Sequence, residues 1–118
     1  MIVNIPISIG ELLDKITILE IKSLFTNNEY VSKELEELNQ IKFTLTQYTL
    51  EDEVKLKEVN LKLWTIEDRL RVLEKEQRFD EEFIELARSV YKTNDLRASI
   101  KKKINEETQS TYQEVKLY

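Results

Sequence analysis

Apolar side chains recur every three or four residues along most of this chain, which is the spacing of one face of an α-helix. The pattern begins in the stretch PISIGELLDKITILEIK, residues 6–22, where Ser8 precedes Glu11 at the capping-box spacing typical of a helix start. We therefore predict a first helix from Ile9 to Phe25, ended by a pair of asparagines. The apolar, β-branched residues 1–7 before it predict one short strand.

The same spacing predicts further helices in the remainder of the chain. A second helix is expected over residues 29–48 and a third over residues 49–78. On the third helix the apolar residues follow the 3-4-3-4-3 spacing of a left-handed helix pair: Leu56, Val59, Leu63, Ile66, Leu70 and Leu73. Asp80 is a candidate N-cap for a fourth helix that ends at Tyr91. A fifth helix is expected to begin at Thr93 or Asn94 and to end near Glu107.

One Gly and one Pro leave few sites for sharp turns, which indicates an all-α protein. We expect residues 1–118 to form a single helical domain, an antiparallel bundle of four to five helices. In this bundle the second and third helices form a long hairpin. Residues 110–118 alternate in character and fit either an extended tail or a strand, which could pair with residues 1–7.

The composition narrows the chemistry that the chain can perform. It contains no Cys and no His, which excludes Cys-based zinc or iron–sulfur sites, a thiol nucleophile and a Ser-His-Asp arrangement. Any catalysis would depend on carboxylates, Lys, Arg, Tyr or a carboxylate-held Mg²⁺. No cofactor is expected, and Mg²⁺ is considered only for a protein that acts on a phosphorylated ligand.

Charge and targeting signals limit the partners and the location. The net charge is −5, which argues against nucleic acid as a partner. Residues 1–10 hold none of the basic residues that begin a secretory signal, and no apolar run is long enough to cross a bilayer. The sequence therefore predicts a cytoplasmic protein with no membrane partner.

Glu20 is the charged residue that most needs a partner. It falls among the apolar residues of the first helix, and a buried carboxylate without a partner would cost several kcal/mol. We therefore predict that Glu20 forms a structural ion pair. The candidate partners are Arg69, Arg71 and Arg97.

Two polar groups are candidates for a ligand site. The third helix carries a stripe spaced by four and three residues, which fits either an anionic or planar ligand or the rim of a helix contact: Asn60, Trp64, Glu67, Arg71, Glu74 and Arg78. Further on, Arg97 and Lys101 share a helix face with Asn94 and Asn105. This face could bind phosphate, or it could be a solvated face that offsets acidic residues elsewhere.

Four blocks resemble an uncharacterised family of small all-helical proteins from bacteria and marine phages. They are PISIGELLDKITILEIKS, LWTIEDRLRVLE, FIELARSVYKTNDLRASIKKKIN and the closing EVKLY, with P-I-S-x-G-E-L-L-D-K-I-T-I-L-E-I-K and L-W-x-I-E-D-x-L-R as the family patterns. The resemblance implies no activity, substrate or cofactor, and it places the family loosely near surface-polysaccharide and glycosyltransferase genes. Several of the polar candidates lie in these blocks, which supports a shared site: Glu20, Trp64, Glu67, Arg71, Asn94 and Arg97.

Two functions follow from these patterns. In the first, the protein is a small cytoplasmic binding or accessory protein that acts through protein contacts, with a second copy or another protein as its partner. In the second, it binds or acts on a phosphorylated or nucleotide-sugar ligand, with Glu20 or Glu67 as the acid or base. The second function requires that six side chains converge in one cleft: Trp64, Glu67, Arg71, Asn94, Arg97 and Lys101.

Overall fold

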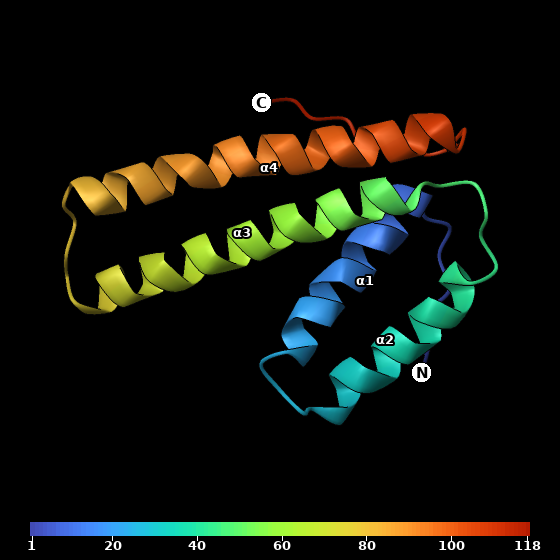
Figure 1. Ribbon diagram of the computed structural model, residues 1–118, viewed down its shortest axis with the longest axis horizontal. Coiled ribbons are helices and arrows are strands. Elements are labelled where there is room, and N and C mark those ends of the chain that lie inside the picture. Colours follow the sequence, from blue (N-terminus) through green and yellow to red (C-terminus); the bar gives the residue numbers. More distant parts are fainter.

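The computed structural model describes residues 1–118 and contains four helices and no strand (Figure 1). The helices are α1 (Ile9–Ser23), α2 (Glu29–Lys42), α3 (Leu50–Lys75) and α4 (Glu81–Glu107). The two long helices α3 and α4 lie side by side as a hairpin, and the shorter pair α1 and α2 lies beside one end of it (Figure 1). The predicted all-α helix bundle is therefore confirmed.

Local chemistry explains where the helices begin and end. Each start has a side-chain oxygen that accepts a hydrogen bond from a backbone N–H of the first turn, provided by Ser8, Asn28, Thr49 and Asp80. After α3 and α4 the chain turns through a left-handed residue, Gln77 at φ 57° and Gln109 at φ 51°. Behind each turn a backbone N–H reaches a carbonyl five residues back, which ends the helix.

The predicted hairpin of the second and third helices is wrong. The long hairpin is formed by α3 and α4, whereas α2 packs on α1 and makes no packing contact with α3. One ion pair, Lys42 with Glu53 at 2.8 Å, links α2 to α3 directly. The second helix also ends at Lys42 instead of continuing to Tyr48. Its packing partner α1 has 15 residues and α2 has 14, so a longer α2 would extend beyond the helix that it packs on.

The predicted break between a fourth and a fifth helix is also wrong. Thr93 is 4% exposed and lies inside the continuous helix α4, although a threonine followed by Asn94 resembles an N-cap in the sequence. Buried or half-buried residues continue through the expected break at spacings of three and four: Phe83, Leu86, Val90, Thr93, Arg97, Ile100 and Ile104. Because this face packs along its whole length, the helix is not interrupted at Thr93.

The core lies where α1 meets the hairpin. Leu13, Leu56 and Ile104 are fully buried there, one from each of α1, α3 and α4. The two terminal segments leave this region in different directions: residues 2–9 border a groove with α1 and α2, while the C-terminal tail runs back along α4 (Figure 1). Their predicted pairing in a small sheet is therefore wrong. No helix has the length and apolarity needed to cross a membrane.

Candidate functional site

A buried carboxylate, Asp14 of α1, is the centre of the polar interior. It is 4% exposed. Arg97 of α4 donates to it through Nε, at 2.9 Å from Oδ1, and through Nη2 to Oδ2. Asn60 of α3 donates to Oδ1 from 2.9 Å. One carboxylate of α1 thus joins this helix to both helices of the long hairpin, α3 and α4.

Thr17 extends this contact along α1. Its hydroxyl donates to the carbonyl of Asp14 at 2.9 Å and accepts a hydrogen bond from Asn60 Nδ2 at 2.9 Å. Residues three apart share a helix face, so Asp14 and Thr17 present two acceptors to the same amide of α3. This arrangement holds the Asn60 side chain in one orientation.

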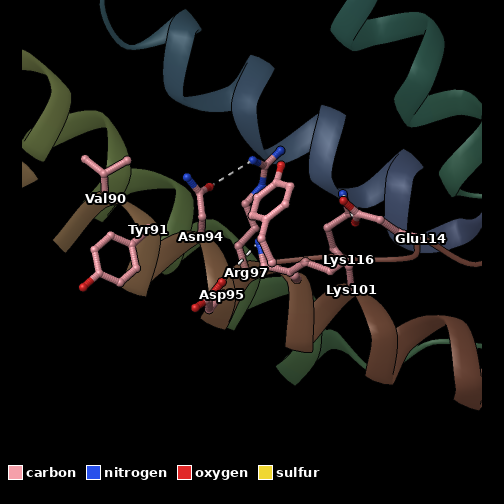
Figure 2. Close-up of a pocket in the computed structure, with 10 residues that line it drawn as sticks. Val90, Tyr91, Asn94, Asp95, Arg97, Lys101, Glu114 and Lys116 are labelled. Atoms are coloured by element: carbon pink, nitrogen blue, oxygen red, sulfur yellow. Dashed lines mark hydrogen bonds and ion pairs between the residues drawn. The ribbon is translucent and has the colours of Figure 1, made fainter. Parts of the chain in front are cut away.

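Lys101 forms the second cationic centre, one helical turn after Arg97. Its side chain is only 7% exposed, and its Nζ lies 2.6 Å from Glu11, 3.1 Å from Glu114 and 3.8 Å from Asp14. Glu114 belongs to the C-terminal tail, which therefore covers this cation (Figure 2). We call the group Glu11, Asp14, Arg97, Lys101 and Glu114 the ionic cluster. Its three carboxylates and two cations carry a net charge of −1.

The cluster shifts the pKa values of its members. Burial by itself would raise the pKa of Asp14, but the hydrogen bonds from Arg97 and Asn60 and the nearby cations outweigh burial and lower it below 3.8. For Lys101, burial opposes the charge, yet the surrounding carboxylates raise its pKa above 10.5. Asp52, which is 1% exposed and paired with Lys103 at 2.9 Å, also has a lowered pKa, because Lys103 and Thr49 outweigh its burial.

We expect the protein to lose stability in acid. A carboxyl group whose folded pKa lies below its unfolded value binds protons more readily in the unfolded chain, so its contribution is present above that unfolded value and is lost as the pH falls. For Asp14 and Asp52 the free energy of unfolding should therefore decline as the pH falls below about 5 and continue to decline below 3.8. Urea unfolding at a series of pH values measures this decline. The Asp14→Asn variant should show a shallower decline, and an equally steep one would contradict the assignment.

Two cavities lie on either side of Arg97, and the predicted site residues divide between them. The tail cavity, about 490 Å³, is lined by Asn94, Arg97 and Lys101 together with residues of the tail (Figure 2). The Trp64 cavity, about 550 Å³, is lined by eight residues: Ile18, Asn60, Leu63, Trp64, Glu67, Asp68, Arg71 and Arg97. Arg97 is the one residue that borders both, so the six candidates do not share a single cleft.

Glu20 has a different partner from those predicted. Its side chain is 31% exposed and pairs with Lys57 at 3.3 Å. Arg69 and Arg71 instead pair on the surface with Glu82 and Glu67, each at 2.9 Å, and Arg97 is bound to Asp14. The three predicted partners are therefore wrong, because Lys57 on α3 lies nearer to this end of α1.

The sequence pattern indicated Glu20 and not Asp14, although Asp14 is the more deeply buried of these two carboxylates. A signal for it was present, because α1 carries a second apolar sector with Ile21 in addition to its main apolar face, and Asp14 lies in that sector. Asp14 is the more strongly enclosed of the two carboxylates.

The protein is therefore all-helical, and its first and last helices enclose the ionic cluster. No curated protein and no solved structure matches the chain. The chain belongs to a family of unknown function, DUF6165, whose model matches residues 2–118. This membership agrees with the predicted resemblance to an uncharacterised family.

Proposed function

We propose that the protein is a helical binding module that acts through protein contact and works as a homodimer. The observation that supports this most is the surface of one chain, which leaves 8608 Å² accessible. A compact monomer of this length exposes about 6,700 Å². The Cα radius of gyration, 16.1 Å, likewise exceeds the value of about 13.5 Å for a compact chain. The excess is larger than the roughly 800 Å² that each partner buries in a standard interface.

Five of the exposed large hydrophobic residues border one groove: Ile2, Val3, Ile5, Ile7 and Ile41. The N-terminal groove is a depression of about 990 Å³ between residues 2–9, α1 and α2, and 11 of its 20 lining residues are hydrophobic. Ile2, Val3 and Ile5 line it and are still 78%, 75% and 67% exposed. Contiguous apolar surface of this kind is typical of a protein contact site.

A second copy fits this surface for reasons of charge and backbone chemistry. A two-fold dimer places the same surface opposite itself, so like charges near the axis would repel. Residues 1–10 contain no charged side chain, so two copies of this segment that pair about the axis bring no like side-chain charges together. The six charged residues that line the groove lie on α1 and α2. Residues 2–7 also donate no backbone–backbone hydrogen bond within the chain, so two extended segments can pair with each other.

The molar mass in solution tests the proposal. Size-exclusion chromatography with light scattering should give twice the mass of one chain. Ile5→Asp should shift the equilibrium to the single chain, because a carboxylate would lie opposite its own copy. Val115→Asp is the matched control, since Val115 is 76% exposed but lies in the other terminal segment. A mass of one chain at every concentration, or a dimer unaffected by Ile5→Asp, contradicts the proposal.

Binding of a phosphorylated or nucleotide-sugar ligand is less well supported as the main function. Its six candidate side chains line two cavities instead of one. Arg71, Arg97 and Lys101 are each already paired with a carboxylate. The ionic cluster has a net negative charge, which opposes a phosphate group.

A further inference from the structure

The Trp64 cavity has the composition of a small-molecule site. It is formed by Ile18 of α1, by α3 and by Arg97 of α4, and its volume of about 550 Å³ lies within the usual range of ligand pockets, roughly 300–1,000 Å³. Ile18, Leu63 and Trp64 provide an apolar surface, and amide, carboxylate and guanidinium groups surround it. It shares only Ile18 with the lining of the N-terminal groove, so a ligand here leaves residues 2–7 free for the proposed dimer.

Trp64 is held in place by an aromatic neighbour. Phe25, just after α1, stacks on it with 5.3 Å between the ring centroids and 7° between the ring planes. Such a stack restricts the rotation of the indole before any ligand arrives. A restrained aromatic ring at a cavity loses little conformational entropy when a second planar group binds it.

One buried and one half-buried side chain at this cavity have polar groups that the fold leaves unused. Asn60 is only 5% exposed, and its Nδ2 donates to Asp14 and Thr17. Its Oδ1 accepts no hydrogen bond within the chain, and solvent can reach this atom. This carbonyl oxygen is therefore an open acceptor.

Arg97 provides the complementary donor. Its three hydrogen bonds, to Asp14 through two nitrogens and to Asn94 at 3.5 Å through Nη1, leave two of its five N–H groups unused. Asn60 and Arg97 both donate to the same Oδ1 atom of Asp14, so the two side chains are neighbours. Asn60, with its open acceptor, and Arg97, with two unused N–H groups, both line the cavity that contains Trp64.

We propose that the Trp64 cavity binds a purine or pyrimidine nucleoside through its base. Each nucleobase is a flat ring with a hydrogen-bond donor beside an acceptor on one edge, which matches Asn60 Oδ1 and the Arg97 guanidinium, and each can stack on an indole. Asp68 lines the cavity and makes no ion pair or hydrogen bond, so its carboxylate can accept from a ribose hydroxyl.

The charges at the cavity select the nucleoside over its phosphate. Both cations there are neutralised, Arg71 by Glu67 at 2.9 Å and Arg97 by Asp14. Asp68 adds an unpaired negative charge. A phosphate group would therefore gain no free cation, and the recognition energy comes from the base and the ribose.

Because Trp64 is the only tryptophan, its fluorescence reports on this cavity alone. Titration of the full chain with adenosine, guanosine, cytidine and uridine should change the emission saturably for at least one nucleoside. Saturation-transfer NMR of that complex should show the strongest signals on the base protons. The 5′-monophosphate should bind no more tightly than the nucleoside. The absence of a saturable change with all four nucleosides would overturn the proposal, as would binding of the monophosphate alone.

Variants then locate the contacts. Trp64→Ala should weaken binding, measured by saturation-transfer NMR, by about tenfold or more because stacking on the indole is lost. Lys62→Ala, two residues before Trp64 on α3 and outside the cavity, should leave it unchanged. Asp68→Ala removes no contact of the fold and should weaken binding of the nucleoside but not of the free base. Undiminished binding in Trp64→Ala, or equal weakening of base and nucleoside by Asp68→Ala, contradicts the proposal.

Discussion

Replacing Asp14 with alanine is expected to lower the free energy of unfolding by about 3–5 kcal/mol. The substitution removes the carboxylate that receives two nitrogens of Arg97 and the amide of Asn60. Arg97 would then remain enclosed without an opposite charge, and Lys101 would lose one of its three carboxylates. Since the free energy of unfolding of small domains is about 5–15 kcal/mol, this single change should remove a large part of it. Urea denaturation followed by circular dichroism measures it.

The control for Asp14→Ala is a surface ion pair of the same kind. Arg71 pairs with Glu67 at 2.9 Å, but its side chain is 74% exposed, so Arg71→Ala should cost no more than about 0.5 kcal/mol. A double variant, Asp14→Leu with Arg97→Met, should recover much of the lost stability because apolar groups replace both buried charges. If Asp14→Ala stays within about 1 kcal/mol of the wild type, the ionic cluster does not stabilise the fold as we describe.

Gly10→Ala is expected to destabilise the protein by about 1–3 kcal/mol, although alanine is the better helix former. The backbones of α1 and α4 approach each other closely here: a Cβ on Gly10 would lie 2.6 Å from Asn105 Oδ1 and 3.0 Å from the Lys101 carbonyl oxygen. Asn105 is 2% exposed and accepts a hydrogen bond from the Gly10 N–H at 2.9 Å, so it cannot move away without losing that bond. Thermal and urea unfolding both measure the loss.

A coupled variant separates the steric effect from helix propensity. In an Asn105→Ala background the atom closest to the new Cβ is absent, so Gly10→Ala should cost less than it does in the wild type. Lys15→Ala, at an exposed position of the same helix, should be nearly neutral. Equal costs of Gly10→Ala in both backgrounds would show that the contact with Asn105 is not the cause.

Local signals predicted the class of the fold well. The spacing of apolar residues and the caps at Ser8 and Asp80 give the starts of two helices correctly, because these features act within one helical turn. They cannot say which helices pack together. The long hairpin was placed one helix too early because the apolar stripe of α2 is compatible with either neighbour, and packing on α1 determines the choice.

Prediction of the site had the same limit. Helical geometry correctly identified Arg97 and Lys101 as neighbours on one face of a helix, and Trp64, Glu67 and Arg71 as neighbours on another. The partners of these residues depend on contacts between distant segments, such as Asp14 with Arg97, 83 residues apart. A carboxylate at the centre of a helix face, Glu20, was therefore chosen over Asp14, which is the one enclosed by three helices.

The contact between α1 and α4 also determines the order in which the chain can fold during its synthesis. Residues of α3 and α4 meet through a short turn and can associate as soon as both have formed. The carboxylate of Asp14 is synthesised early but cannot meet Arg97 and Lys101 until α4 has also left the ribosome. Until then its helix has an unpaired acidic side chain beside exposed leucines. Completion of this fold is therefore a late event in which the first helix to be synthesised docks onto the last of the four.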